Sequence, residues 1–437
     1  MIRVSITTLG CRVNSYESDA MAGLIRSAGF EIVPENEPAD VAIINTCTVT
    51  NIADRKSRQM ISRARKLNPR AKLIVTGCWS QREPERALSL PGVCAVIGNS
   101  EKSRVLDFIR AALSGDEPSP VPDIMRERSF EELPSEAEGR TRAFLKIQDG
   151  CDRFCTYCAI PYARGRVRSR GLDSVRRELE RLNDAGFAEV VFTGIHLTDY
   201  GKDLENTNLA DAVDMAKGLD GIKRIRLGSL EPHGMTDELI ERLTGNERVC
   251  PQFHLSLQSG SDTVLARMRR GYTADEYADI VGRIRDSYGA NAPFAAITTD
   301  IIAGFAGETE LEHMETLAFM ERVGFARTHV FPYSRRSGTI ADRMPGQLEN
   351  AVKAKRAQEL IGKGRELERR FLERFIGREV RVLIETEHEG GLWGGFSESY
   401  VRVLTDRGAP NTFADVIIKS ITEDENGELS LLSHNRG

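Results

Sequence analysis

Apolar and polar positions along the first quarter of the chain follow two alternating patterns. Short apolar runs predict buried strands near 2–8, 40–45, 72–76 and 94–97. Helical periodicity follows these runs at 14–28, 51–67 and 83–88. Strands that alternate with helices are typical of a parallel sheet covered by helices. The pattern therefore predicts a small Rossmann-like α/β domain over residues 1–113.

The same alternation returns after a break in periodicity. Residues 114–139 are rich in Pro, Ser, Asp and Glu, which is typical of a linker between domains. Beyond it, apolar runs lie at 143–148, 188–194, 222–229, 252–258, 295–304 and 327–334. Six strand–helix units are too few for a closed eight-stranded barrel. They predict an open (β/α)6 partial barrel over residues 140–373.

The pattern changes again near the end of the chain. Short strand-like runs alternate there with turn residues, including the glycine-rich stretch EGGLWGGF. This pattern predicts a small β-barrel over residues 374–437. The chain of 437 residues is long enough for about three domains with cores of their own.

Composition narrows the possible setting. The formal net charge is −5, so no strong basic excess indicates nucleic-acid binding. No run of about 18 apolar residues predicts a membrane span, and the N-terminus lacks the apolar region of a signal peptide. We therefore expect a cytoplasmic protein without membrane contact. In a reducing compartment its eight cysteines are better candidates for metal ligands than for disulfides.

Three cysteines lie within eight residues. Cys151, Cys155 and Cys158 form the pattern C-x3-C-x2-C, with the aromatic Tyr157 before the last of them. Three thiolates suit three corners of a cubane iron–sulfur cluster, and the absent fourth ligand leaves one iron open, as in catalytic metal centres. A zinc knuckle and three unrelated thiols are the alternatives.

Three further cysteines are far apart in sequence but share one context. Cys11, Cys47 and Cys78 each follow a predicted strand and precede a helical stretch. The carboxyl ends of parallel strands meet at one edge of a sheet, so the fold would bring these thiols together. A second three-thiolate site is predicted, with structural cysteines as the alternative. Cys94 and Cys250 lie in or beside predicted strands and are expected in the core.

Several longer motifs carry a resemblance. The C-x3-C-x-aromatic-C pattern is that of the radical S-adenosylmethionine (SAM) superfamily, and the whole chain resembles the methylthiotransferase family within it. The resemblance rests on TLGCRVNSYES, INTCTVTNIADRKSRQ, QDGCDRFCTYCAIPYARGRVRS, FTGIHLTDYG, RLGSLEP, HLSLQSGS and FPYSRRSGT. These motifs are most similar to the branch that modifies threonylcarbamoyladenosine. One departure is Ala306, which stands where a proline is expected.

The resemblance implies a function and its cofactors. It implies radical SAM-dependent methylthiolation of C2 of N6-threonylcarbamoyladenosine at tRNA position 37, with isopentenyladenosine 37 or a ribosomal-protein aspartate as alternative acceptors. One [4Fe-4S] cluster on Cys151, Cys155 and Cys158 would cleave SAM to a radical. A second [4Fe-4S] cluster on the three N-terminal cysteines would carry the sulfur. The C-terminal module resembles a TRAM domain, the partner is tRNA, and the electron donor is a flavodoxin or ferredoxin.

Other residues are weaker candidates. By resemblance, SAM would contact Tyr157, Thr193, Gly194, Ser229, Gln258 and Gly304, although a structural role is as plausible for each. His196 and His254 are expected in the core. The alternating Arg164, Arg166, Arg168 and Arg170 suit phosphate contacts or a solvated loop, and Arg164 alternatively suits the SAM carboxylate.

Two regions are candidates for RNA contact, and they differ in net charge. Residues 54–66 hold six basic residues and one acidic residue, which suits tRNA. Residues 377–437 hold 6 Lys and Arg against 11 Asp and Glu, whereas an RNA-binding module is usually basic. Contact there would fall to Arg402, Trp393 or Phe396, with core packing as the alternative. Two alternatives belong to other functional classes: a two-cluster electron carrier, and an RNA-binding protein whose clusters are structural.

Overall fold

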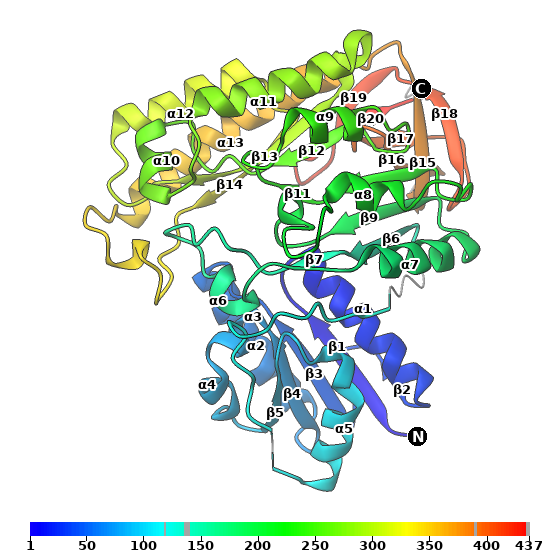
Figure 1. The fold of residues 1–437 in the computed structure, drawn as a ribbon, viewed down its shortest axis with the longest axis vertical. Coiled ribbons are helices and arrows are strands. Elements are labelled where there is room, and N and C mark those ends of the chain that lie inside the picture. The colour runs from blue at the N-terminus through cyan, green and yellow to red at the C-terminus, as the bar shows by residue number, and fades with distance from the viewer. Residues whose placement is uncertain (118, 135–139, 389–390, 434–437) are drawn as a thin grey trace.

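The computed structural model describes residues 1–117, 119–134, 140–388 and 391–433. The N-terminal sheet forms a lobe of its own, and the central strands and the C-terminal sheet form a second, larger lobe above it (Figure 1). This arrangement confirms the predicted α/β fold class. Of the expected linker, residues 118 and 135–139 lie outside the described residues.

The N-terminal lobe is a five-stranded parallel sheet with the order β2-β1-β3-β4-β5. Its strands are β1 (Arg3–Thr8), β2 (Glu31–Val33), β3 (Val41–Thr46), β4 (Lys72–Gly77) and β5 (Val93–Ile97). Its helices are α1 (Arg12–Ser27), α2 (Asn51–Leu67), α3 (Cys78–Arg82), α4 (Pro84–Leu88) and α5 (Val105–Ser114). Strand order reverses between β1 and β3, which in open α/β sheets marks the place where ligands bind.

Apolar layers on both faces hold this sheet. Met21 and Phe108, from α1 and α5, pack on one face, and Ile61 and Trp79, from α2 and α3, pack on the other. Every residue of β3 is buried, as expected for the central strand of a covered parallel sheet. The sequence pattern missed β2, which has only three residues, and α3, which begins at the cysteine itself.

The central region is an open barrel of parallel strands. Its strands are β6 (Arg142–Lys146), β9 (Glu189–Thr193), β10 (Arg224–Leu227), β11 (Ser229–Leu230), β12 (Gln252–Leu255), β13 (Ala296–Ala303) and β14 (Arg327–Pro332). They pair as β10-β9-β6 and β11-β12-β13-β14. Only Gly228 separates β10 from β11, so the two sheets together supply the six strand positions that were predicted.

Helices cover the outside of this barrel. They are α7 (Leu172–Asp184), α8 (Leu209–Asp214), α9 (Asp237–Thr244), α10 (Asp262–Met268), α11 (Ala274–Ser287), α12 (Glu310–Val323) and α13 (Asn350–Glu373). Helix α6 (Ile160–Arg164) instead lies against α3 of the N-terminal lobe. Short 3-10 turns lie at η1 (Lys102–Arg104), η2 (Leu197–Asp199), η3 (Gly289–Phe294) and η4 (Ala341–Arg343). A small antiparallel pair, β7 (Gln148–Asp149) and β8 (Arg168–Ser169), closes the loop that bears the second cysteine set.

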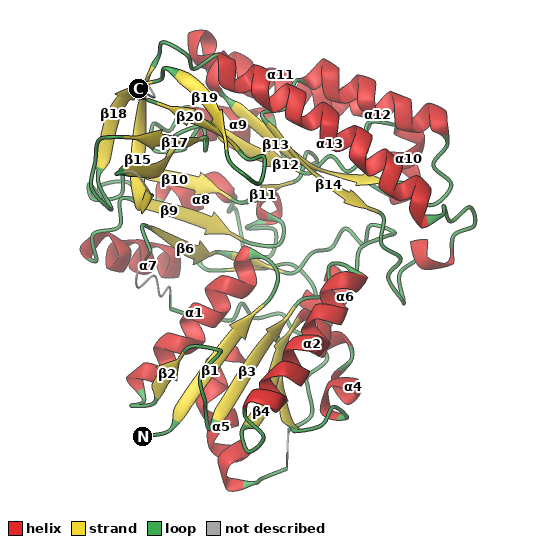
Figure 2. Ribbon diagram, turned by 180° about the vertical axis from the view of Figure 1, so that it is seen from behind, coloured by secondary structure: helices red, strands yellow, loops and turns green. Residues whose placement is uncertain are grey.

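The C-terminal region is a six-stranded sheet with the order β18-β15-β16-β17-β20-β19. Its strands are β15 (Glu379–His388), β16 (Leu392–Ser397), β17 (Arg402–Thr405), β18 (Phe413–Ile417), β19 (Ser420–Glu423) and β20 (Leu429–Leu432). Neighbours are antiparallel except β17 and β20. Val382, Val403 and Leu431 pack with Phe371 and Phe375 from the end of α13, so the long helix joins this sheet to the barrel (Figure 2). In the described part of the chain, no helix is both long and apolar enough to cross a membrane.

Candidate active site

One cavity of about 1170 Å³ is lined by cysteines of both sets, although Cys47 and Cys78 lie outside its lining. Its wall includes Cys11 from the N-terminal lobe and Cys151, Cys155 and Cys158 from the barrel loop. Residues of the C-terminal sheet close another side of it, among them Phe396. All three regions of the chain therefore contribute to a single space.

The three N-terminal cysteines lie at the ends of three neighbouring strands. Cys11 follows β1 and caps α1, Cys47 follows β3, and Cys78 follows β4 and begins α3. Cys11 and Cys47 thus flank the place where strand order reverses. A Cβ at Gly10, whose φ is +104°, would lie 2.8 Å from the Cβ of Cys47, so glycine is needed for this close approach.

The surroundings of these thiols disfavour free thiolates. Burial, and to a lesser degree the neighbouring Cys78, raise the pKa of the Cys47 thiol to about 12. An unliganded Cys47 is therefore a neutral thiol at pH 7. A coordinating metal deprotonates its thiol ligand, so these three thiols would hold an iron–sulfur cluster as thiolates.

The second cysteine set lies on a loop fixed by backbone contacts. Cys151 N donates to Gly165 O at 3.0 Å, and Thr156 N donates to Met268 O at 3.1 Å. The Tyr157 ring packs edge-on against Phe305, with 6.4 Å between their centroids. The loop is thus held from both sides, and the predicted aromatic lines the cavity.

An arginine contacts one sulfur of this second set. Arg270 Nη1 lies 3.3 Å from Cys155 Sγ, and its Nη2 donates to Glu231 at 2.6 Å and to Ser256 O at 2.7 Å. Arg270 and Glu231 escaped the sequence analysis because they lie 39 residues apart. The available signal was their place, since Glu231 directly follows β11 in the RLGSLEP motif.

In the described part of the chain, no three Cys, His, Asp or Glu side chains converge on one metal position. This is compatible with a cluster, because cluster thiolates bind different irons rather than one ion.

Most of the residues predicted to contact SAM line the cavity. Thr193, Gly194, Ser229 and Gln258 do so. Gln148 fixes the loop after β9, since its Oε1 accepts from Ile195 N at 2.9 Å and His196 N at 2.8 Å.

Gly304 lies outside that lining. A Cβ at Gly304 would lie 2.6 Å from Lys353 Cγ on α13, and its φ is +71°. Helix packing therefore explains this glycine, and its contact with SAM stays a prediction.

The arginine loop corrects one expectation. Arg164, Arg168 and Arg170 are buried, and only Arg166 is exposed. A solvated or phosphate-binding loop is therefore wrong for three of the four. Glu17, which pairs with Arg164, lies in a distant part of the chain that loop composition could not reveal. Asp149 and Glu178, which pair with Arg168 and Arg170, are near in sequence.

The two histidines differ in their surroundings. His196 is buried, with Nδ1 2.6 Å from Asp199 Oδ2. His254 is half-buried and lies farther from its acid, with Nε2 3.4 Å from Asp300 Oδ2. Both line the cavity, so neither belongs only to the core.

The C-terminal sheet meets the N-terminal lobe beside Cys11. Arg12 Nη2 donates to the Tyr400 hydroxyl at 3.2 Å, and the Tyr400 ring stacks on Phe396 with centroids 4.7 Å apart. Burial alone would raise the pKa of Tyr400, but the guanidinium groups of Arg142 and Arg12 bring it below its usual value. Trp393 packs against the core of this sheet, whereas Arg402 and Phe396 line the cavity.

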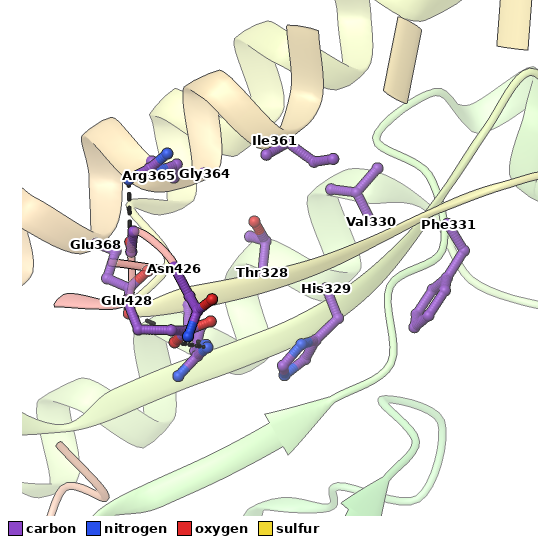
Figure 3. A pocket seen from close by; sticks show the side chains of 12 residues that line it. Thr328, His329, Val330, Phe331, Ile361, Gly364, Arg365, Glu368, Asn426 and Glu428 are labelled. Carbon is purple, nitrogen blue, oxygen red and sulfur yellow. Dashed lines mark hydrogen bonds and ion pairs between the residues drawn. The ribbon is translucent and has the colours of Figure 1, made fainter. Parts of the chain in front are cut away.

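A second, smaller cavity of about 340 Å³ lies between β14, α13 and the turn before β20 (Figure 3). Arg365 Nη2 donates there to Gly427 O at 3.0 Å. None of the cysteines lines it. This smaller cavity lies where α13 packs against the C-terminal sheet, and it offers no thiol ligand for a cluster.

Comparisons with known proteins agree with this arrangement. Residues 3–98 match the uncharacterized protein family UPF0004, and residues 145–320 match the radical SAM superfamily. The radical S-adenosylmethionine methyltransferase TsrM from Kitasatospora setae, in a structure with cobalamin and a [4Fe-4S] cluster bound, has a similar fold. Its TM-score is 0.56 and its identity 14%, with coverage of 98% of this chain and 87% of that one.

Relatives in sequence span nearly the whole chain. The threonylcarbamoyladenosine tRNA methylthiotransferase MtaB of Bacillus subtilis is 41% identical, covering 92% of this chain and 90% of the relative. That of Thermotoga maritima is 38% identical, covering 97% and 96%. The tRNA-2-methylthio-N(6)-dimethylallyladenosine synthase of Thermotoga petrophila is 35% identical, covering 96% and 95%. The chain therefore belongs to the radical SAM methylthiotransferase family.

Proposed function

We propose that this protein is a tRNA methylthiotransferase that acts on C2 of N6-threonylcarbamoyladenosine at position 37. The observation that carries the proposal is one cavity lined by Cys11 of the first three-cysteine set and by all three cysteines of the second, each set being short of a fourth ligand. Two [4Fe-4S] clusters and SAM are its cofactors. An electron carrier with two clusters would not need an open cavity of this volume between them.

The cofactors supply the radical and sulfur chemistry, since the C2–H bond of adenine is beyond acid–base catalysis alone. The chain itself fixes geometry. Strand ends hold Cys11, Cys47 and Cys78, and a braced loop holds the second set. The loop after β9, fixed by Gln148, offers backbone groups to SAM. Barrel and C-terminal sheet enclose the space in which an adenine must lie between the two sites.

The wall next to Cys11 supports the choice of acceptor. The exposed guanidinium of Arg12 faces the cavity and, among the described residues, forms no ion pair with a carboxylate. The threonylcarbamoyl group carries a carboxylate, which an arginine binds well. A dimethylallyl group is apolar and carries no group that could pair with this charge. The observation therefore favours threonylcarbamoyladenosine over isopentenyladenosine.

The partner tRNA, the electron donor and the location complete the proposal. The exposed face of α2 presents Arg55, Lys56, Arg63 and Lys66, which suits the phosphate backbone. A flavodoxin or ferredoxin supplies the electron. A cytoplasmic location would keep the cysteine ligands reduced.

Nucleoside analysis of tRNA from a deletion strain tests the acceptor. We expect the wild-type gene to restore methylthiolated threonylcarbamoyladenosine. Arg12→Gln should lower this product at least tenfold, because it removes a charged hydrogen bond, and should leave SAM cleavage without tRNA unchanged. Arg110→Gln, an exposed position on α5, is the matched control. Restoration of methylthiolated isopentenyladenosine instead would contradict the proposed acceptor.

A further inference from the structure

Arg164 lies fully buried between the N-terminal lobe and the barrel. Its Nε donates to Cys78 Sγ at 3.2 Å. Its Nη2 donates to Asn14 Oδ1 at 2.6 Å and to Glu17 Oε2 at 3.0 Å. The residue ends α6, just after the second cysteine set, yet all three acceptors belong to the N-terminal lobe. One guanidinium thus joins the two halves of the site through a cysteine sulfur.

Arg164 belongs to a buried group of charges with more cations than carboxylates. The carboxylates that form its ion pairs are Glu17 and Asp149, and the cations are Lys102, Lys146, Arg164 and Arg168. Lys146 Nζ lies 2.8 Å from Glu17 Oε1 and 2.7 Å from Asp149 Oδ2. Lys102 Nζ lies 3.1 Å from Glu17 Oε2.

Glu131 is the next carboxylate. It accepts from Ser103 N at 2.7 Å, and its charge acts on Lys102 and Lys146 without a short ion pair in the described chain. The four cations still outnumber the three carboxylates. Buried charge is costly unless it is paired. The group that Arg164 contacts on its remaining side is Cys78. A cluster held by thiolates brings negative charge to this side.

We propose that Arg164 is a positioning residue of the N-terminal iron–sulfur site, balancing the negative charge of the cluster and raising its reduction potential through the hydrogen bond to Cys78. This inference rests on the proposed function, since it needs a cluster on Cys11, Cys47 and Cys78. Hydrogen bonds to cluster sulfurs and nearby charge are known determinants of cluster potential. The same excess charge would stabilise an anionic sulfur group at the open iron.

A merely structural salt bridge is the competing explanation. Loss of Arg164 would then loosen the contact between the two lobes, and the redox properties of a loaded cluster would not change. Stability alone therefore cannot separate the two roles. The reduction potential can, because it reports the electrostatic energy of one added electron at the cluster.

The test uses the full-length protein in which Cys151, Cys155 and Cys158 are replaced by alanine, so that only the N-terminal cluster remains. Potentiometric titration after anaerobic reconstitution, followed by electron paramagnetic resonance, gives its potential. We expect Arg164→Gln to lower the potential by at least 59 mV, which is a tenfold change for one electron. Arg164→Lys keeps the charge but loses the fork of hydrogen bonds, so its shift should be smaller and in the same direction.

Arg166→Lys is the matched control, because Arg166 is exposed and pairs with Asp152 at 3.3 Å without touching a sulfur. Its potential should equal that of the parent. An unchanged potential in an Arg164→Gln protein that retains about four irons would overturn the inference. If Arg164→Gln does not fold, an unchanged potential in Arg164→Lys would overturn the inference instead. A parent protein without iron would refute the proposed function itself, a distinguishable outcome.

Discussion

The two cysteine sites differ in how they are built and in the charge around them. The N-terminal site takes one thiol from each of three strand ends and adjoins a buried excess of cations around Arg164. The barrel site takes three thiols from one loop, and its arginine, Arg270, is balanced by Glu231. The first site thus suits an added anion, such as a sulfur ligand. The second offers a near-neutral wall to SAM, which carries charges of both signs.

Removing the cysteine ligands of one site at a time should have the largest effects, and the two variants should lose different activities. Replacing Cys151, Cys155 and Cys158 by alanine should abolish SAM cleavage. Replacing Cys11, Cys47 and Cys78 should preserve SAM cleavage and abolish methylthiolation. Chromatographic assay of 5′-deoxyadenosine and of modified nucleosides measures both. Loss of SAM cleavage in a folded N-terminal triple variant would show that the sites are not independent.

Glu17→Gln sharpens the contrast in charge. Glu17 is fully buried and pairs with Arg164, Lys102 and Lys146, so its loss leaves cations unpaired. Breaking a buried pair in this way costs about 3–5 kcal/mol. Denaturant unfolding measures the loss, with Glu35→Gln as the exposed control. A change below about 1 kcal/mol would contradict the buried-charge account.

Arg270→Lys perturbs the charged contact at the barrel site while keeping the positive charge. The hydrogen bond to Cys155 and the pairing with Glu231 would both weaken. Loss of such an outer contact typically costs 10–100-fold in metal affinity or activity. We expect SAM cleavage to fall by about this factor. Arg269→Lys, exposed and adjacent, should have no effect, and equal rates for the two variants would remove Arg270 from the site.

Glu312 forms a salt bridge with Arg267 away from both cysteine sites, and its loss should have the smallest effect on stability. Hydrogen bonds from Arg267 hold its pKa at about 2, so its stabilising contribution is complete above its unfolded pKa of about 4.3 and is lost as pH falls toward 2. Glu312→Gln should cost about 1 kcal/mol at pH 7 and flatten the fall in stability between pH 5 and pH 3. Unfolding curves at several pH values test this. An unaltered slope would contradict the assignment.

Sequence alone was sufficient wherever chemistry followed local order. Spacing predicted a site at Cys151, Cys155 and Cys158. The strand–cysteine–helix context predicted that Cys11, Cys47 and Cys78 follow neighbouring strands, because parallel strands end at one edge. The contacts between distant segments could not be predicted. Arg164 resembled a loop residue because Glu17 lies 147 positions away, and the contact between Arg12 and Tyr400 spans 388 positions. Strand β2 was missed because three residues carry too little periodicity.

Contacts between the two lobes also explain why one sequence motif had no role that the sequence could reveal. The motif FPYSRRSGT carried the resemblance without an assigned role. In the structure Arg336 Nη2 donates to Thr48 Oγ1 at 2.6 Å and to Asp54 Oδ2 at 2.7 Å, beside Cys47. The barrel therefore braces the N-terminal site from this side as Arg164 does from the other. Such bracing depends on tertiary packing and leaves no periodic signal.

The most direct test of the central claim is the iron and sulfide content of anaerobically reconstituted protein. Wild type should hold about eight irons, and the alanine variant of Cys11, Cys47 and Cys78 about four, the counts for two cubanes and for one. This result would establish two independent clusters. About four irons in both proteins would leave the N-terminal cysteines without a cluster and contradict the sulfur-transfer function.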